Sequence, residues 1–455
     1  MKREHPCHTP LFTDLYELTM SAVYFEREMF APATFSFFVR RYPKHWRFFV
    51  AVGVEEVLSF LENFHFTQTE LEYLDSLGLF KQEFLDYLAN LRFSGEVWAL
   101  PEGSIFFTEE PVLEVTAPII EAQLIETFVI NTLNFGSLIA TKAARCVLAA
   151  QGKALVDFSA RRTHGVDASL KVARASFLAG FLATSNTYAG KIYQIPVTGT
   201  MAHSFIESFP QEIEAFRAFA QVFPENTVLL LDTYDTIAAA HKAVQIAREL
   251  EKQGFRLRGV RLDSGDLVSL SKQVRQILDE ARLSYVKIFA SGGLDEYRIA
   301  ELLGQGAPID AFGVGTKVGV AADAPYLDAA YKLVAYDGRA VTKLSTGKRT
   351  LAGPKQVFRF GDSPLEKDLI GLRDEEIPGA QPLLQCQMKE GKRLFPPLRL
   401  EQIKEKVSQG LSALPGALKE ILPQEKFYPV ELTPALKELQ ERVEKEIRLK
   451  EGLPS

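Results

Sequence analysis

Polar and glycine residues follow a series of apolar segments in the middle of the chain, where each segment ends. These groups are Arg161-Arg162-Thr163-His164-Gly165, Thr200-Met201-Ala202-His203-Ser204, Asp232-Thr233-Tyr234-Asp235, Asp263-Ser264-Gly265-Asp266, Ser291-Gly292-Gly293 and Gly313-Val314-Gly315-Thr316. Arginine binds phosphate through paired hydrogen bonds, and carboxylates bind sugar hydroxyls or hydrated magnesium. The set therefore predicts a site for a phosphorylated ligand.

The two glycine turns are candidate phosphate-binding elements. Ser291, Gly292 and Gly293 stand before a predicted helix, and Gly315 and Thr316 stand at the end of a predicted strand. Glycine lets backbone N–H groups approach an anion, and a helix N-terminus adds positive potential. A single turn of this kind is as readily an ordinary loop. Two of them on neighbouring strands resemble the phosphate cradle of barrel enzymes.

The charged candidates each have a plainer interpretation. Arg161 and Arg162 could bind phosphate or form surface ion pairs. Asp263 and Asp266 could bind ribose hydroxyls or magnesium, although Asp266 also reads as a helix N-cap. His203 could act as a base, a nucleophile or a phosphate acceptor, but most loop histidines have no chemical role.

Alternating strands and helices must position these residues. The apolar pattern predicts strands over 154–160, 194–200, 227–232, 258–263, 286–292 and 311–316, and helices over 166–183, 235–254, 266–281 and 294–306. Such repetition indicates a parallel sheet, either closed into a barrel or open. Ligands bind at the carboxyl ends of parallel strands, so we expect the site in the loops within 157–316.

The flanking regions have a different pattern. Strands over 35–43, 47–53 and 95–115 surround predicted helices between 54 and 91, which indicates an N-terminal α+β domain. Beyond 330 we expect a hairpin around Asp337-Gly338 and then charged amphipathic helices with a solvated face. The predicted domains are 1–130, α+β; 131–345, the βα barrel with the site; and 346–455, an extension that packs on the N-terminal domain and ends in a helical tail.

Composition excludes several functional classes. The 455 residues are 47% hydrophobic and 24% charged with a net charge of −6, which predicts a large core and no nucleic-acid-binding surface. The three cysteines, Cys7, Cys146 and Cys386, are too far apart in sequence for a zinc or redox motif and suit a reducing compartment. With no signal-like start and no apolar run of about 18 residues, we expect a cytoplasmic protein without a membrane partner.

Several motifs together resemble the nicotinate phosphoribosyltransferase family over about residues 10–360. They are LFTDLYELTM (11–20), LPEGSIFFTEEPVLEV (100–115), FSARRTHG (158–165), GTMAHSF (199–205), GVRLDSGDL (259–267), ASGGLDE (290–296), FGVGTKV (312–318) and KLSTGKRTLAGPKQVFR (343–359). In the last motif the family commonly has Pro-Gly before the lysine, whereas this chain has Gly353-Pro354, which leaves the role of Lys355 open.

The resemblance implies a fold and a reaction. The fold is an irregular βα barrel of the type II phosphoribosyltransferase kind beside an N-terminal α+β domain, in a homodimer. The reaction converts nicotinate, phosphoribosyl pyrophosphate and ATP into nicotinate mononucleotide, pyrophosphate, ADP and phosphate, with Mg2+, as the first step of NAD salvage from nicotinate. Rival interpretations are a nicotinamide or a quinolinate phosphoribosyltransferase, or a nucleotide-binding sensor without activity.

The resemblance also assigns roles to residues. His203 is transiently phosphorylated, and Tyr16 borders the pyridine ring across the dimer interface. Thr200 and Arg261 lie at the nicotinate, and Thr316 lies at the sugar phosphate. The residues themselves add that Asp263 could stabilise positive charge on the ribose ring and that Arg161 could bind the leaving pyrophosphate.

Overall fold

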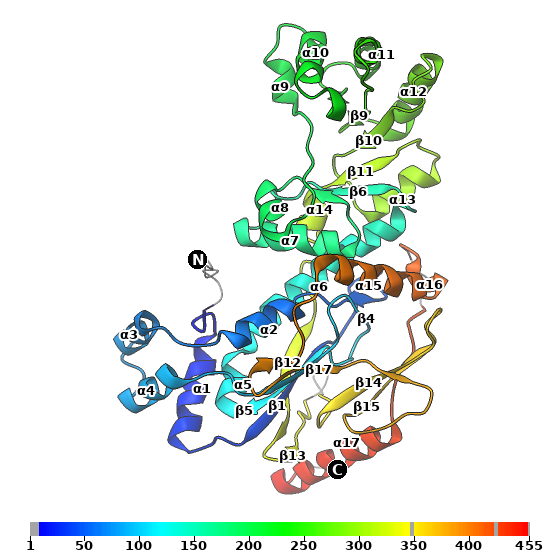
Figure 1. Ribbon diagram of the computed structural model, residues 1–455. Coiled ribbons are helices and arrows are strands. Elements are labelled where there is room, and N and C mark those ends of the chain that lie inside the picture. The colour runs from blue at the N-terminus through cyan, green and yellow to red at the C-terminus, as the bar shows by residue number, and fades with distance from the viewer. Residues whose placement is uncertain (1–8, 346–349, 423–425, 454–455) are drawn as a thin grey trace. The chain divides into compact units, whose positions relative to one another are not determined.

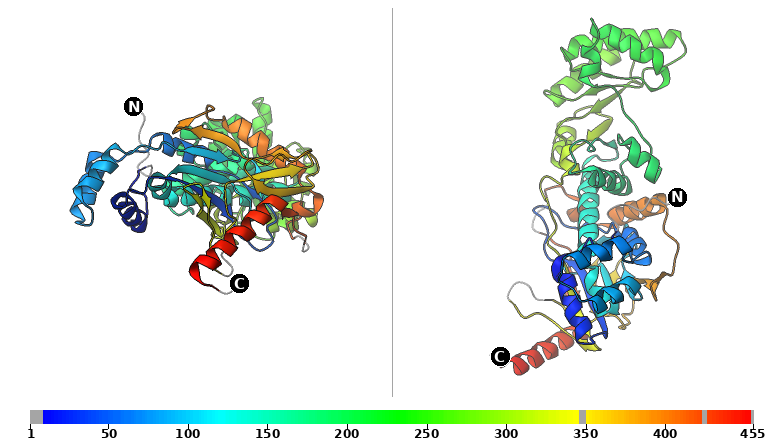
Figure 2. Two further views of the ribbon diagram at one scale, coloured as in Figure 1. Left: turned by 90° about the horizontal axis from the view of Figure 1, so that it is seen from below. Right: turned by 90° about the vertical axis from the view of Figure 1, so that its left-hand side faces the viewer.

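The computed structural model describes residues 9–345, 350–422 and 426–453, which form two compact units (Figures 1 and 2). The first unit takes its described residues from 1–138, 326–418 and 423–455, and the second consists of 139–325 with 419–422. Helix α6 (Glu126–Ala149) contributes residues to both. Of the helices described, none combines the length and the apolar character that a membrane span needs.

The first unit is built on an antiparallel sheet. Within its described part, seven strands lie in the order β13-β12-β1-β5-β3-β17-β18. Their bounds are β1 (Pro32–Val39), β3 (Glu96–Ala99), β5 (Leu113–Pro118), β12 (Ala329–Tyr336), β13 (Arg339–Ala340), β17 (Gln385–Lys389) and β18 (Lys392–Arg393). The β12–β13 hairpin turns at Asp337 and Gly338, whose φ values of 51° and 71° are those of a type I′ turn, and this confirms the predicted hairpin.

Shorter sheets and helices complete this unit. The sheets are β2 (Phe49–Val50) with β4 (Ile105–Phe106), and β16 (Gln381–Pro382), β14 (Lys355–Phe360), β15 (Lys367–Leu372) and β19 (Val430–Leu432) in that order. The helices are α1 (Leu15–Glu26), α2 (Val54–Glu62), α3 (Gln68–Ser76), α4 (Gln82–Asn90), α5 (Ile119–Leu124), α15 (Leu400–Ala413), α16 (Gly416–Lys419) and α17 (Pro434–Glu451). The mixture confirms the predicted N-terminal α+β character.

The second unit contains the predicted βα alternation. Its strands are β6 (Ala154–Asp157), β7 (Ala183–Thr184), β8 (Val228–Leu230), β9 (Gly259–Leu262), β10 (Lys287–Ala290) and β11 (Ala311–Val314). Its other helices are α7 (Val166–Ala179), α8 (Thr187–Tyr193), α9 (His203–Glu207), α10 (Glu212–Val222), η1 (Pro224–Asn226), α11 (Thr236–Lys252), α12 (Leu267–Glu280), α13 (Glu296–Gly304) and α14 (Thr316–Gly319). The helices cover the sheet with apolar faces, such as Val274 and Leu278 on α12.

The strands of this unit follow the cyclic order of a βα barrel. All are parallel, and their order is β7-β6-β11-β10-β9-β8, so that the first strand of the series, β6, lies beside the last, β11 (Figure 1). Among the residues described here, no strand pairing joins β7 to β8. The predicted irregular barrel is confirmed as a curled sheet that is open between these two strands.

One predicted strand is wrong. Residues 194–200 form only a single bridge, between Val197 and Thr184, and the strand at this place in the sheet is the short β7. Pro196 has no N–H to donate, which limits pairing here to the hydrogen bonds on either side of Thr184. Residues 326–345 belong to the first compact unit, and the three-part division into 1–130, 131–345 and 346–455 stays a prediction.

Candidate active site

The carboxyl ends of the parallel strands bring several predicted residues together. Arg261 Nη1 donates to Thr200 Oγ1 at 2.6 Å, and the Ser291 hydroxyl donates to Asp263 Oδ1. The backbone N–H of Asp263 donates in turn to Asp232 Oδ2 at 3.0 Å. Three loops, those that follow β8, β9 and β10, are therefore joined directly by hydrogen bonds.

Arg261 is a largely buried cation with few partners. Among the described residues its one hydrogen bond is to Thr200, and its Nε atom is buried without any partner. Burial lowers the pKa of the guanidinium, while Asp263 and Asp232 act in the opposite direction. The group stays charged, because an arginine side chain is not deprotonated in proteins. A desolvated guanidinium with a free donor is suited to bind a carboxylate.

Asp232 links two loops and keeps one oxygen free. Its Oδ2 accepts from the backbone of Asp263 and from Ser264 Oγ at 2.6 Å, whereas its Oδ1 is buried without a hydrogen-bond partner. A buried carboxylate oxygen without a donor needs a ligand, a water or a cation. Asp232 therefore keeps one carboxylate oxygen available beside the Asp263 backbone at the strand ends.

His203 opens the short helix α9 and is half-buried. Its Nδ1 lies 3.1 Å from Thr233 Oγ1, on the loop after β8. When Nδ1 carries the proton and donates to the hydroxyl, Nε2 holds a lone pair. This orientation suits a nucleophile that accepts a group at Nε2.

The two glycine turns have different geometric reasons for glycine. Gly292 has a φ of 88°, and a Cβ there would lie 1.9 Å from the carbonyl oxygen of Asp263. Gly293 has a φ of 65° and faces open space, where a ligand could approach its backbone. A Cβ on Gly315 would lie 2.9 Å from the Phe158 carbonyl, and Thr316 is exposed at the start of α14.

The structure separates some of the alternatives left open by the sequence. Arg161 and Arg162 are exposed and form no ion pair with the described residues, and their role stays a prediction. Asp266 accepts from the backbone of Val268 at 3.1 Å and Ser269 at 3.3 Å and is a helix cap, as its alternative interpretation predicted. Asp235 caps α11 in the same way.

One buried carboxylate at the strand ends was not singled out by the sequence analysis. Asp157 is 1% exposed at the end of β6, and its carboxylate accepts from the Ser159 backbone at 2.8 Å and Thr184 Oγ1 at 2.7 Å. An acid that ends an apolar run was the available signal. Thr233 was named in the polar group after its strand, but a threonine in a loop gave no reason to assign it a role.

Tyr16 lies in the first unit, on α1. Its side chain is 47% exposed, and partial burial together with Glu126 and Glu17 raises the pKa of the hydroxyl. The phenol therefore stays neutral and presents an exposed ring edge. Its predicted contact with a pyridine ring stays a prediction.

Lys355 is also in the first unit, and its position answers the question left by its unusual motif. Its ammonium lies 3.0 Å from Glu114 Oε1 and donates to the carbonyls of Gly353 at 2.7 Å and Leu351 at 3.2 Å. The side chain is only 3% exposed. Lys355 is thus a structural residue with its hydrogen-bonding capacity filled.

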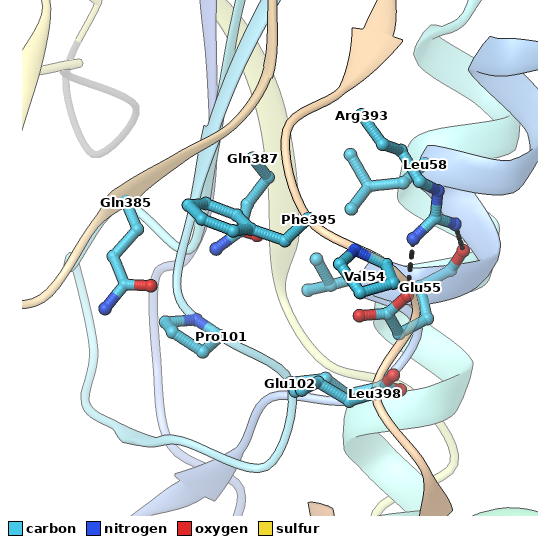
Figure 3. Close-up of a pocket in the computed structure, with 11 residues that line it drawn as sticks. Val54, Glu55, Leu58, Pro101, Glu102, Gln385, Gln387, Arg393, Phe395 and Leu398 are labelled. Carbon is cyan, nitrogen blue, oxygen red and sulfur yellow. Dashed lines mark hydrogen bonds and ion pairs between the residues drawn. The ribbon is translucent and has the colours of Figure 1, made fainter.

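A small cavity of about 130 Å³ also lies in the first unit (Figure 3). It is lined mainly by apolar side chains such as Val54, Leu58 and Phe395. Arg393, which also lines it, is bound to Glu55, as the dashed lines in Figure 3 show. Gln385, Gln387 and Glu102 also line the cavity, which contains none of the residues that the sequence analysis assigned to the site.

No group of three or more His, Cys, Asp or Glu side chains that could hold a metal ion occurs in residues 9–345, 350–422 and 426–453. Magnesium does not need such a group, since it is commonly held by one or two carboxylates, waters and substrate phosphates. The carboxylates of Asp232 and Asp263 fit that mode of binding.

Comparisons with known proteins agree with the fold. The model of the nicotinate phosphoribosyltransferase N-terminal domain matches residues 11–134, and the model of the nicotinate phosphoribosyltransferase family matches residues 153–352. A nicotinate phosphoribosyltransferase of Mycobacterium tuberculosis is 49% identical over 92% of this chain and 90% of its own length. One from Bacillus subtilis is 41% identical over 81% of this chain and 77% of its own length.

A solved structure extends the similarity to three dimensions. The crystal structure of human nicotinic acid phosphoribosyltransferase superposes with a TM-score of 0.85 at 28% identity, covering 95% of this chain and 99% of the human one. The agreement therefore spans both units and both matched regions. The chain belongs to the nicotinate phosphoribosyltransferase family.

Proposed function

We propose that this chain is an ATP-coupled nicotinate phosphoribosyltransferase whose reaction takes place at the strand ends of the second unit. Nicotinate, phosphoribosyl pyrophosphate, ATP and water become nicotinate mononucleotide, pyrophosphate, ADP and phosphate. The observation that carries the proposal is the hydrogen-bonded set Thr200–Arg261 and Ser291–Asp263, in which Arg261 keeps a buried donor without a partner.

Arg261 and Thr200 are the proposed recognition pair for the pyridine base. The guanidinium would bind the carboxylate of nicotinate, and Thr200 holds it in place through the 2.6 Å hydrogen bond. Nicotinamide carries no negative charge and would give the free Nε donor of Arg261 no anionic partner, which favours nicotinate. Tyr16 is the proposed aromatic neighbour of the ring.

The two glycine turns are the proposed cradle of the sugar phosphate. Gly293 and Thr316 expose backbone and side-chain donors, while Gly292 and Gly315 are held against neighbouring carbonyls. The Ser291 hydroxyl donates to Asp263 and so holds the first turn against the loop after β9. The exposed guanidinium of Arg161 is the proposed partner of the leaving pyrophosphate.

Asp263 is the proposed stabiliser of the reacting sugar. The bond between C1 and the pyrophosphate oxygen breaks, and a bond between C1 and the pyridine nitrogen forms, so positive charge develops on the ribose ring. A carboxylate nearby lowers the energy of that charge. Asp232 and Asp263 would hold Mg2+, and the bound ion would neutralise charge on the pyrophosphate.

His203 is the proposed phosphate acceptor. Its Nε2 takes the γ-phosphoryl group of ATP as the bond from that phosphorus to ADP breaks, and water later releases phosphate from the histidine. The hydrogen bond from Nδ1 to Thr233 supports this role, because it leaves Nε2 free. Phosphorylation adds about two negative charges near the loops that bind the anionic substrate. This charge is the proposed link between ATP and turnover.

A homodimer in the cytoplasm is the proposed setting. Helix α1 and the residues before it expose apolar side chains, with Leu15 51% and Val23 58% accessible beside Tyr16. An exposed apolar face supports self-association. The wide spacing of three cysteines supports a reducing compartment.

The decisive experiment measures mononucleotide formation from nicotinate and from nicotinamide, each with phosphoribosyl pyrophosphate and Mg2+, with and without ATP. We expect product from nicotinate, formed faster with ATP. Product chiefly from nicotinamide would contradict the role of Arg261. An absence of product from either base would leave a binding protein as the better explanation.

A further inference from the structure

The two glycine turns lie on adjacent strands but are anchored to different neighbours. The turn after β10 contacts the end of β9. The Ser291 N–H donates to the Leu262 carbonyl at 2.9 Å, and Gly292 packs against the Asp263 carbonyl. The turn after β11 contacts the residue that follows β6, because Gly315 packs against the Phe158 carbonyl. The pairing of β10 with β11 covers only Phe289–Ala290 with Ala311–Phe312 and ends before both turns. Strand pairing therefore does not fix one turn against the other.

One ion pair spans the two turns beyond the strands. Lys317, which follows Thr316 in α14, places its Nζ 2.7 Å from Asp295 Oδ2, two residues after Gly293. The other oxygen, Asp295 Oδ1, caps α13 by accepting from the Arg298 N–H at 2.8 Å. Asp295 is 7% exposed, so its carboxylate is held between the helix start and the lysine.

The Asp295 end of this pair is firmly held. The next residue, Glu296, is fully buried and lies 2.6 Å from Lys142 Nζ and 2.9 Å from Arg145 Nε, both on α6. These buried ion pairs fix the first turn of α13. The Lys317 side chain is 41% exposed, and its partner is fixed. The pair therefore transmits the position of α13 to the start of α14.

We propose that the Asp295–Lys317 pair is a positioning link that holds the two glycine turns at the separation a single phosphate needs. The inference rests on the proposed phosphate cradle and adds to it residues that need not touch the ligand. Without the link, Thr316 and the N–H groups of α14 would lose their alignment with Gly293. Small misplacements of binding groups have large kinetic effects, so the link acts on substrate affinity.

Asp295→Asn tests the link with little damage to the helix. Asparagine is as good an N-cap as aspartate, so the bond to Arg298 is kept while the charge is lost. We expect KM for phosphoribosyl pyrophosphate to rise about tenfold and kcat to change less than about twofold. Lys317→Met should have the same effect, the double variant should be no worse than either single one, and Lys317→Arg should restore most of the affinity.

The chain provides a matched control on the same two strands. Lys287 Nζ lies 3.2 Å from Asp310 Oδ1 at the opposite ends of β10 and β11, away from the turns. Lys287→Met removes an ion pair of the same type from the same strand pair. We expect its KM and kcat to equal those of the unchanged protein.

Three outcomes would overturn the link. A loss of affinity in Lys317→Met with none in Asp295→Asn would show that Lys317 binds the phosphate directly. Equal losses in all variants, Lys287→Met included, would show a general effect on stability. Additive losses in the double variant would show that the two residues act separately.

The link can be tested apart from the proposed function. Should the unchanged protein turn over no phosphoribosyl pyrophosphate, the proposed function fails, and calorimetric titration with inorganic pyrophosphate still compares the variants. Binding weakened about tenfold in Asp295→Asn, and unchanged in Lys287→Met, would support the link. Equal pyrophosphate binding by all of them would overturn it.

Discussion

Two cations, Lys355 in the first unit and Arg261 in the second, differ in how many of their hydrogen-bond donors have an acceptor within the fold. The ammonium of Lys355 has three acceptors within 3.2 Å: a carboxylate and two carbonyls. Arg261 has five N–H donors but one hydrogen-bond partner among the described residues, the hydroxyl of Thr200. Both side chains belong to motifs that the family resemblance singled out. Their surroundings, rather than their motifs, distinguish them.

The difference separates structural charges from charges available to a ligand. A buried charge needs compensation, and Lys355 obtains all of it from the fold. Arg261 obtains part of it and leaves the rest to whatever binds at the strand ends. Removing Lys355 should therefore affect stability, and removing Arg261 should affect activity.

The largest effect is expected from Lys355→Met. Breaking a buried ion pair leaves Glu114 partly uncompensated, which should cost about 3–5 kcal/mol of unfolding free energy. Urea denaturation measures the loss. Lys287→Met, which removes an exposed lysine, is the control and should cost less than about 1 kcal/mol. A stable Lys355→Met protein that has lost its activity would reverse the comparison.

Arg261→Gln should lower kcat/KM for nicotinate about 10²-fold, or roughly 3 kcal/mol, with stability unchanged or increased. The guanidinium forms one hydrogen bond with the fold, so its removal breaks few native contacts, although Asp263 and Asp232 lose a nearby cation. Steady-state kinetics with nicotinate and with nicotinamide measures the change. The discrimination between the two bases should shrink, and an unaltered preference would show that the base is recognised elsewhere.

Thr233→Val should slow phosphorylation of His203 by ATP about tenfold, because Nδ1 loses its hydrogen-bond partner. Base transfer in the absence of ATP should be retained. Phosphohistidine formation from labelled ATP is the measurement, and Thr233→Ser should restore the rate. Equal loss of both reactions would point to a structural role for Thr233.

Glu17 is a buried carboxylate in the first unit whose hydrogen bonds come from hydroxyl groups and not from a cation, and its pKa is raised. Its hydrogen bonds come from the hydroxyls of Thr13 and Thr127, and burial raises its pKa from 4.5 to about 7. The folded protein thus keeps a proton that the unfolded chain releases above pH 4.5. Its contribution to stability is full below about pH 4.5 and is lost as the pH rises to about 7.

Glu17→Gln should remove this loss, which a pKa shift from 4.5 to about 7 sets at about 2–3 kcal/mol between pH 5 and pH 8. Unfolding in urea at pH 5 and pH 8 measures it for both proteins. The difference between the two pH values should be smaller in the variant. An identical difference would mean that Glu17 is ionised at pH 5.

The sequence predicted the parallel strands and the polar strand ends well, because apolar runs followed by polar loops are local features. It failed at 194–200, where Pro196 and the competing strand β7 decide the pairing. The pairing of Arg261 with Thr200 could be expected only from the family resemblance. The contacts of Thr233 and Lys317 depend on how separate loops meet in space, and no local pattern carries that information.

The cyclic strand order has a consequence for synthesis of the chain. Ala154 of β6 pairs with Ala311 of β11, so one edge of β6 stays unpaired until β11 has been synthesised. This is a contact of high sequence separation, which slows folding. Until β11 leaves the ribosome, β6 presents an unpaired apolar edge to which another nascent chain could attach. Chains that end before β11 should therefore depend on chaperones to stay out of aggregates.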